Sequence, residues 1–242
     1  MKCPGQDLRY WKAGDIFESA CPQCGKVLEF FKDDSSRLCK SCGKRVLNPR
    51  IDYGCAAHCK FADQCLRELP PELPAERENL LKDRVAVEMK RYFDKDFKRI
   101  GHAMKVARYA EKILAGEQGD FAVVLIAAYL HDIGIKEAEK RHNSSEAGYQ
   151  EELGPSVARQ ILENLGADCA LTDEVCDIVG HHHSPGPDES INFKIVYDAD
   201  CIVNLEDSHK HEPLLPETMT TVIGKRLLTA TGKNLAKEIL FP

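Results

Sequence analysis

The stretch from Ile126 to Ile135, I-A-A-Y-L-H-D-I-G-I, is the most informative part of the chain. An apolar run ends abruptly in His131 and Asp132, and Gly134 precedes a change to charged sequence. Neighbouring residues on a helix point about 100° apart, so these two side chains converge on one atom only near a helix end. Imidazole and carboxylate both coordinate divalent metals. The stretch therefore predicts either a metal site at the end of a buried helix or a buried histidine followed by a solvated or N-capping aspartate.

Helical spacing of apolar residues continues on both sides of this stretch. The predicted helices are Ala75–Tyr92, Phe97–Leu114, Phe121–His131, Pro155–Leu165, Thr172–His181, Phe193–Leu205 and Pro216–Ile239. No convincing strand occurs in this part of the sequence. We therefore expect a mainly α protein, with an all-α domain over residues 75–242. The proline-rich linker Leu69–Pro74 separates this domain from a cysteine-rich module over residues 1–70.

Charge and hydropathy argue against several classes of protein. The chain has 33 Lys and Arg against 39 Asp and Glu, a net charge of −6, and no arginine-rich run, so its composition does not favour a nucleic-acid partner. No apolar run reaches the roughly 18 residues of a membrane helix, and the first residues lack the apolar core of a signal peptide. We expect a soluble cytoplasmic protein without a membrane partner.

Two CxxC pairs, separated by fourteen residues, mark the cysteine-rich module. Two such turns supply four thiolates to one tetrahedral ion, and the segment between them can form a hairpin. This pattern predicts a zinc ribbon over residues 18–47 with a structural Zn²⁺, a site that also suits binding of a protein partner. Its predicted ligands are Cys21, Cys24, Cys39 and Cys42. Four protein ligands leave no open position, so such a site stabilises a fold and does not catalyse.

A second group of cysteines follows the ribbon. Cys55, Cys59 and Cys65 are clustered, and either Cys3 or His58 could complete a set of four ligands. Three thiolates suit a second zinc ion or an iron–sulfur cluster, and free or redox-active thiols are the third interpretation. Three further cysteines lie in apolar helical segments and are expected in the core: Cys169, Cys176 and Cys201.

Other histidines and aspartates recur in order along the helical part. His102 lies on a helix 29 residues before His131, and the triplet His181–His183 ends a later helix. Asp198 and Asp200 lie in an apolar helix, where burying an unpaired carboxylate is costly. Of the two, Asp198 is better explained as a supporting residue or a helix N-cap. The histidine triplet could also interact with the helix dipole.

This ordered set resembles the HD superfamily of metal-dependent phosphohydrolases, over roughly residues 98 to 206. The matching stretches are Gly101–Val106, Tyr129–Gly134 and Tyr197–Ile202. The resemblance implies that one divalent metal is held by four residues: His102, His131, Asp132 and Asp200. It also implies that His181 or His182 holds a second metal or a substrate phosphate.

Two positions depart from the family pattern. Lys136 resembles the lysine that contacts a phosphate oxygen in many members, but it stands one position later here. Two-metal members often carry a His followed by Pro, where this chain has Leu153–Ser156, L-G-P-S. His142, in a polar segment, is a candidate replacement. A single metal is therefore the expectation from sequence.

The predicted chemistry follows from these ligands. Two imidazoles and two carboxylates suit Mn²⁺, Co²⁺, Ni²⁺, Fe²⁺ or Zn²⁺, and leave positions for water and a phosphate oxygen. Asp132 could accept the proton of that water, while Lys136, His181 and His182 could neutralise the phosphoryl oxygens. The predicted function is hydrolysis of a nucleotide or another small phosphomonoester. A non-enzymatic nucleotide- or metal-binding sensor or adaptor, and a di-iron oxygenase of the same fold, are the alternatives.

Overall fold

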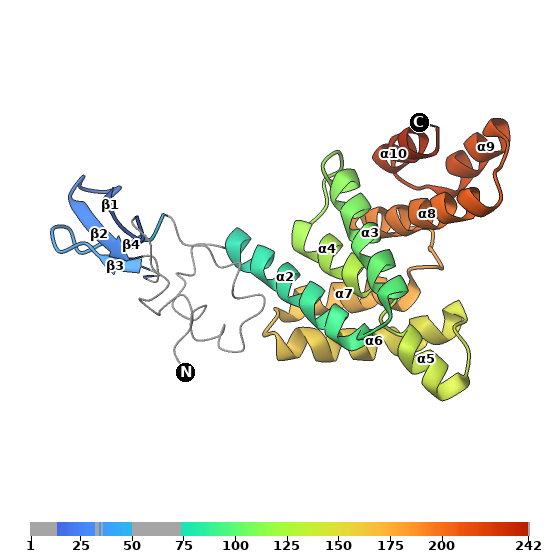
Figure 1. The fold of residues 1–242 in the computed structure, drawn as a ribbon, viewed down its shortest axis with the longest axis horizontal. Coiled ribbons are helices and arrows are strands. Elements are labelled where there is room, and N and C mark those ends of the chain that lie inside the picture. The colour runs from blue at the N-terminus through green and yellow to red at the C-terminus, as the bar shows by residue number, and fades with distance from the viewer. Residues whose placement is uncertain (1–13, 32–33, 35, 50–73, 242) are drawn as a thin grey trace. The chain divides into compact units, whose positions relative to one another are not determined.

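The computed structural model describes residues 14–31, 34, 36–49 and 74–241 (Figure 1). The chain divides into two compact units, Met1–Leu80 and Leu81–Pro242. The predicted linker Leu69–Pro74 lies almost entirely outside the described residues, so the predicted domain boundary stays a prediction.

The described part of the first unit consists of two β-hairpins. Strand β1 (Ile16–Ala20) pairs antiparallel with β2 (Val27–Phe31), and β3 (Ser36–Leu38) pairs antiparallel with β4 (Arg45–Leu47). We had expected one hairpin between the two CxxC pairs. That segment instead gives one strand to each of two hairpins, because each CxxC turn closes a hairpin of its own.

The two CxxC turns have the same backbone geometry. The Cys21 amide donates to the Lys26 carbonyl at 2.8 Å, and the Cys39 amide donates to the Lys44 carbonyl at the same distance. Gly25 and Gly43 follow the pairs with φ of 72° and 74°, in the left-handed region that glycine enters without steric cost. The small core of this unit is formed by Cys21, Phe30, Cys39 and Val46, with Phe17 and Leu28 packed against it.

The chain from residue 74 onward is helical, which confirms the predicted fold class. None of the helices in the described part is both long enough and apolar enough to cross a membrane. The helices are α2 (Pro74–Phe93), α3 (Phe97–Leu114), α4 (Phe121–Leu130), α5 (Ile135–His142), α6 (Ala147–Asn164), α7 (Cys169–His181), α8 (Ile191–His211), α9 (Pro216–Arg226) and α10 (Ala230–Leu240).

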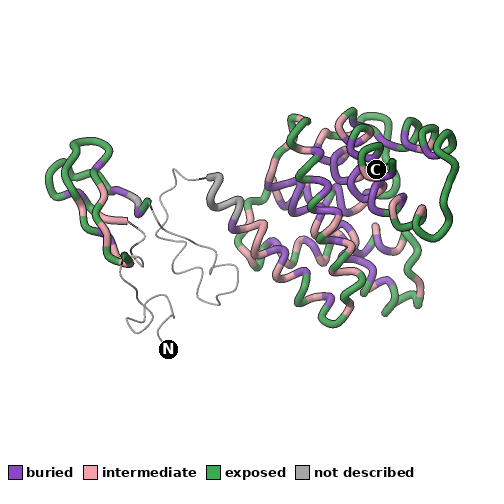
Figure 2. Tube along the Cα trace, turned by 45° about the horizontal axis from the view of Figure 1, so that its top comes forward, coloured by how far each residue is buried: buried purple, intermediate pink, exposed green. Residues whose placement is uncertain are grey.

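Helix α4 is the centre of the helical unit, and its residues are buried on nearly every side (Figure 2). Asp120 caps its start by accepting the Val123 amide at 2.9 Å. The helix packs against α3, α7 and α8. Because every face of α4 has an apolar neighbour, its end, and the residues that follow, are held in a fixed position.

Two features of the segment after α4 differ from the prediction. His142, placed in a polar segment, is the last residue of α5, and α6 begins at Ala147, well before the expected start at Pro155. Proline is favoured in a first helical turn, but here it lies inside α6 and leaves the Glu151 carbonyl without its helical donor. Packing of α6 against α5 and α7 outweighs this local preference.

The C-terminal segment forms two helices where the sequence predicted one. The break between α9 and α10 is held by Asp198 of α8, which is fully buried. Its carboxylate accepts the amides of Leu228 and Thr229, both at 2.7 Å, and the Thr229 hydroxyl at 2.6 Å. A distant carboxylate thus stabilises a turn that the local sequence does not reveal.

Candidate functional site

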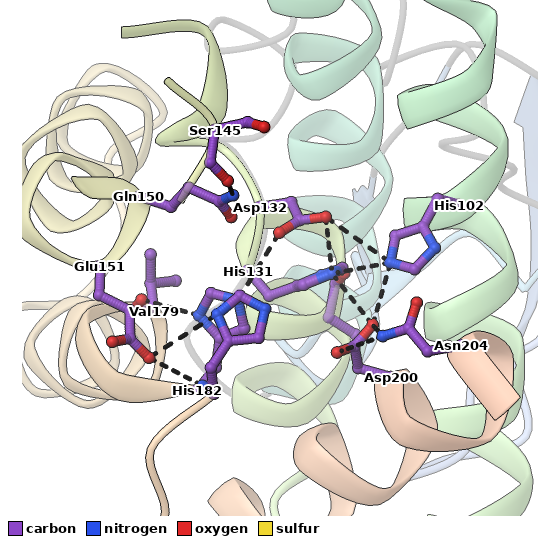
Figure 3. Close-up of polar contacts among 12 residues, drawn as sticks. His102, His131, Asp132, Ser145, Gln150, Glu151, Val179, His182, Asp200 and Asn204 are labelled. Atoms are coloured by element: carbon purple, nitrogen blue, oxygen red, sulfur yellow. Dashed lines mark hydrogen bonds and ion pairs between the residues drawn. The ribbon is translucent and has the colours of Figure 1, made fainter. Parts of the chain in front are cut away.

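Four of the predicted metal ligands converge in the helical unit, and we call them the His–Asp centre: His102, His131, Asp132 and Asp200. His102 lies on α3, His131 is the C-cap of α4, Asp132 follows in the turn, and Asp200 lies on α8 (Figure 3). His102 Nε2 is 3.2 Å from His131 Nε2 and 3.0 Å from Asp200 Oδ1. Asp132 Oδ2 is 3.3 Å from His131 Nε2 and 3.6 Å from His102 Nε2.

These separations suit a shared ion. A metal–ligand bond of about 2.1 Å places neighbouring ligand atoms roughly 3.0 to 3.4 Å apart at octahedral or tetrahedral angles. The four donors are two imidazole nitrogens and two carboxylate oxygens, a mixed set that suits a divalent transition metal. The residues present therefore fit the divalent metal that the resemblance noted in the sequence implies.

The backbone around His131 explains why the donors meet. Helix α4 ends at Leu130, and Gly134 then brings the turn against α6. A Cβ atom at Gly134 would lie 2.3 Å from the Gln150 carbonyl oxygen, so no other residue fits there without movement. The glycine in the H-D-I-G stretch therefore serves close packing that keeps Asp132 beside His131.

Hydrogen bonds orient two of the donors. His131 Nδ1 donates to the Ala128 carbonyl at 2.9 Å, so Nε2 is the ring nitrogen that faces the other donor atoms. The Asn204 amide, one turn after Asp200, donates to both oxygens of that carboxylate at 3.0 Å. These partners hold the donor atoms in place before any ligand arrives.

The electrostatics of the centre favour a cation. Burial alone would lower the pKa of His131, but the charges of Asp132 and Asp200 outweigh it and raise that pKa to about 9. Burial opposes ionisation of Asp132, yet its histidine neighbours hold its pKa well below the usual range. The pKa of Asp200 is also lowered, because the His102 hydrogen bond and the His131 charge exceed the effect of burial. Two ionised carboxylates thus share a pocket that attracts positive charge.

The three consecutive histidines have different surroundings. His182 is buried, its Nδ1 donates to the Val179 carbonyl at 3.0 Å, and its Nε2 is 3.6 Å from Asp132 Oδ1. His181 is instead paired with Glu189 at 3.2 Å and stacked on Phe193. Of the two histidines proposed from sequence for phosphate or a second metal, His182 lies against the His–Asp centre and His181 is engaged elsewhere.

Two further predicted residues do not join the centre in this conformation. The Lys136 ammonium donates to the Tyr92 carbonyl at 2.7 Å, so it is bound to the end of α2. His142 stacks on Tyr149 with ring centroids 4.1 Å apart. The predicted role of Lys136 in phosphate binding would require it to leave the Tyr92 carbonyl.

Two polar residues in this part of the molecule, Arg99 and Gln150, were not predicted from the sequence. Arg99 lies one turn before His102 and binds Glu139 Oε2 at 3.0 Å. Burial lowers its pKa, but the carboxylates around it, Asp132 among them, give a net rise. Gln150 is buried, and its side-chain amide donates to the Ser145 carbonyl (Figure 3), while its Oε1 has no hydrogen-bond partner among the described residues. The helical spacing of Arg99 and His102 was the one available signal.

The predicted zinc-ribbon cysteines form a second donor set, which we call the four-cysteine cluster: Cys21, Cys24, Cys39 and Cys42. Their sulfurs lie within 4.8 Å of one another, with Cys21 and Cys42 3.7 Å apart and Cys24 and Cys39 3.6 Å apart. Tetrahedral zinc with bonds of about 2.3 Å requires sulfurs about 3.8 Å apart. The cluster therefore fits a zinc-ribbon-like module.

The thiols of this cluster influence one another. Amide donation from residues 42 and 41 lowers the pKa of Cys39 to about 6. The Lys44 amide acts in the same direction on Cys42, but burial and the neighbouring thiols raise its pKa to about 12. A cation bound among these sulfurs would offset the charge that opposes ionisation of Cys42.

The other predicted cysteine ligands lie outside the described residues: Cys3, Cys55, Cys59 and Cys65, with the alternative ligand His58. Cys169, Cys176 and Cys201 lie on helices α7 and α8 and belong to none of the groups of candidate ligands among the described residues.

Comparisons with known proteins agree with this geometry. Residues 99–205 match the model of the HD domain family. No curated protein sequence matches the chain significantly.

Three solved structures resemble the chain. A predicted HD superfamily hydrolase from an uncultured Thermotogales bacterium has a TM-score of 0.46 and 23% identity, covering 73% of this chain and 88% of its own. YpgQ of Bacillus subtilis has a TM-score of 0.47 and 21% identity, with 67% and 89% covered. The Lin1889 protein of Listeria innocua has a TM-score of 0.42 and 19% identity, with 66% and 89% covered. At these scores the likeness says nothing about activity or substrate.

The family match extends from three residues before His102 to five residues after Asp200, so it includes all four residues of the His–Asp centre. The order of these residues in the sequence and their convergence in space agree with that match. Within the helical unit, residues 99–205 therefore resemble an HD domain both in sequence and in the placement of these four residues.

Proposed function

We propose that the helical unit is a metal-dependent phosphohydrolase that cleaves a nucleotide or another small phosphomonoester. The convergence of His102, His131, Asp132 and Asp200 carries this proposal. The two imidazole Nε2 atoms are 3.2 Å apart, and each lies 3.0 to 3.7 Å from an oxygen of both carboxylates. A divalent metal held there would make a water more acidic and draw charge from a phosphoryl group.

The chain's own residues supply the remaining functions. Asp132 keeps its carboxylate ionised, and its Oδ1 faces away from His102, so this oxygen can accept a proton from a water in the centre. His182 Nε2 makes no hydrogen bond among the described residues, so it can accept one or, once protonated, donate one to a phosphoryl oxygen.

Arg99 is the cation best placed to orient an anionic substrate. It lies one helical turn from His102, and its side chain is one-quarter exposed. Glu139 and Asp96 hold its guanidinium, at distances of 2.5 and 2.9 Å. A phosphate that replaces Glu139, which is bound by both terminal nitrogens of Arg99, would be held at the rim of the centre.

The test is release of inorganic phosphate from a panel of nucleotides and small phosphomonoesters by the full chain loaded with Mn²⁺. We expect metal-dependent turnover that Asp132→Ala abolishes and Asp173→Ala, a change at an exposed surface ion pair, leaves intact. Binding of metal and nucleotide without turnover would contradict the proposal and support the sensor alternative.

A further inference from the structure

A cavity of about 440 Å³ lies between helices α2, α3 and α4, and we call it the α3 cavity. Its volume falls within the roughly 300–1,000 Å³ that is typical of small-molecule pockets. The side chains that give it its chemical character are Lys82, Met104, Lys105, Arg108, Leu125 and Tyr129. The four residues of the His–Asp centre are not part of this lining, so the cavity is a separate candidate site.

The α3 cavity and the His–Asp centre lie on different faces of α3. His102 turns toward α8, where its Nε2 is 3.0 Å from Asp200 Oδ1. Met104 and Arg108 follow His102 by two and six residues. Their side chains therefore leave the helix about 160° and 120° away from that of His102. A ligand in the cavity can bind without touching the candidate metal ligands.

The charged side chains of the lining favour an anion. Three are cationic and one, Glu111, is a carboxylate. Lys82 and Lys105 already have carboxylate partners, at 3.6 and 3.0 Å. Arg108 makes no ion pair with a carboxylate in the described part of the chain, and its guanidinium carbon lies 5.6 Å from the centre of the Tyr109 ring. A guanidinium in this state can bind a phosphate group through two parallel hydrogen bonds.

The remaining lining suits a planar ring. Met104 is 37% exposed, and Leu125 lies at the buried side of the cavity. Tyr129 is half-buried on α4, whose other residues from Ala122 to Leu130 are buried. Its hydroxyl makes no hydrogen bond to another described residue, and burial raises its pKa, so it stays a neutral donor. A thioether and an aromatic ring both pack well against a flat, weakly polar group.

We propose that the α3 cavity binds a small organic phosphate with a planar ring, of the size of a nucleoside monophosphate. Arg108 binds the phosphate, and Met104 and Tyr129 contact the ring. The site requires no metal and is independent of the proposed hydrolase activity. The chain would therefore have a second place for a phosphorylated ligand, apart from the place where a substrate is cleaved.

The test is a titration of the full chain with AMP, followed by the NMR signals of ¹³C-labelled methionine methyl groups. It is made on the Asp132→Ala variant, without added divalent metal, so that the His–Asp centre lacks one of its ligands. Met104 lines the cavity, whereas Met89 and Met219 are fully buried elsewhere. We expect the Met104 signal alone of these three to shift, with saturation at one AMP per chain.

Two comparisons identify the contacts. Adenosine and inorganic phosphate, each with one half of the ligand, should bind at least about 10-fold more weakly than AMP. Arg108→Ala in the same background should weaken AMP binding by at least about 10-fold, because it removes a charge-assisted pair of hydrogen bonds. Lys112→Ala is the matched control, since it removes the same charge from an exposed position of α3 outside the cavity. It should leave the affinity within about twofold, because water and salt screen its charge.

The outcomes separate this proposal from the proposed hydrolase. A Met104 signal that does not move with AMP, or binding that Arg108→Ala and Lys112→Ala weaken equally, would overturn the α3 cavity as a ligand site. Binding in the wild type that disappears in Asp132→Ala would place the nucleotide at the His–Asp centre and also overturn it. A chain that binds AMP in the cavity but releases no phosphate from any ester would contradict the hydrolase and support this site.

Discussion

The four-cysteine cluster and the His–Asp centre are two candidate metal sites that differ in how much folded structure supports them. The cysteines belong to two short hairpins whose small core includes two of the candidate ligands, Cys21 and Cys39. The histidines and aspartates lie on helices or directly after a helix end, in a unit whose extensive core is formed by apolar residues. A metal at the first site would hold the fold together, whereas the helical fold holds the second site together.

The difference extends to coordination. Four thiolates complete a tetrahedral ion and leave no position for substrate. The His–Asp centre has two nitrogens and two oxygens, which leave positions open on an ion that takes five or six ligands. The first site is therefore suited to stability and the second to chemistry. Four measurements test this distinction.

The largest expected effect is unfolding of the two hairpins when the metal is removed from the four-cysteine cluster. Chelation, or Cys39→Ser, should unfold residues 14–49, because the remaining core is too small to stabilise them. Amide NMR spectra should lose the dispersed signals of these residues and retain those of residues 81–241. Cys169→Ser, at an exposed cysteine outside the cluster, is the control. Hairpin signals that persist without metal would contradict the proposal that a metal at this cluster stabilises the fold.

The stability of the helical unit should depend on buried hydrogen bonds that do not belong to a candidate metal site, such as those of Asp198. Asp198→Ala removes three hydrogen bonds at the start of α10 and leaves buried amides unsatisfied. We expect it to lower the free energy of unfolding of the helical unit by about 2–4 kcal/mol. Urea unfolding measures the change, and Asp207→Ala, at an exposed position of the same helix, should stay within about 0.5 kcal/mol of wild type. Equal losses in the two variants would show that this buried carboxylate has no special role.

A smaller effect concerns the orientation of one donor. Asn204→Ala frees the Asp200 carboxylate from both of its amide contacts while the helix remains intact. We expect Mn²⁺ affinity at the His–Asp centre to fall about 10- to 100-fold. Calorimetric titration gives the affinity, and the exposed Asn164→Ala is the control. Unchanged affinity would mean that the fold alone positions Asp200.

The weakest effect should be a pH dependence of stability. Burial raises the pKa of Glu206, but hydrogen bonds from Lys210, Tyr109 and Lys105 outweigh it and lower that pKa to about 2. Because the folded pKa lies below the ordinary value, this stabilisation is present above about pH 4.5 and is lost as pH falls toward 2. It should amount to less than about 1 kcal/mol, since water screens the group.

Comparison of wild type with Glu206→Gln isolates this contribution. The difference in free energy of unfolding between them should shrink from pH 6 to pH 3. A constant difference over that range would assign the effect of the substitution to packing, and not to charge.

The amino-acid sequence is sufficient to assign the type of each unit and the identity of the central residues. Two CxxC pairs define four thiolates whatever the packing, and an apolar run that ends in His131 and Asp132 places both at the end of a buried helix. The order of His102, His131, Asp132 and Asp200 along the chain was enough to suggest a shared site. Residue type and local spacing carry this information, so no tertiary contact was needed.

The other residues that join these sites are known from the folded structure alone. Glu151 of α6 accepts the amide of His183, which follows α7, and no local pattern distinguishes Glu151 from its neighbour Glu152. The break between α9 and α10 depends on Asp198, about thirty residues earlier in the sequence. These relations arise because helix packing brings distant segments into contact, and a single sequence does not encode that packing in any local pattern.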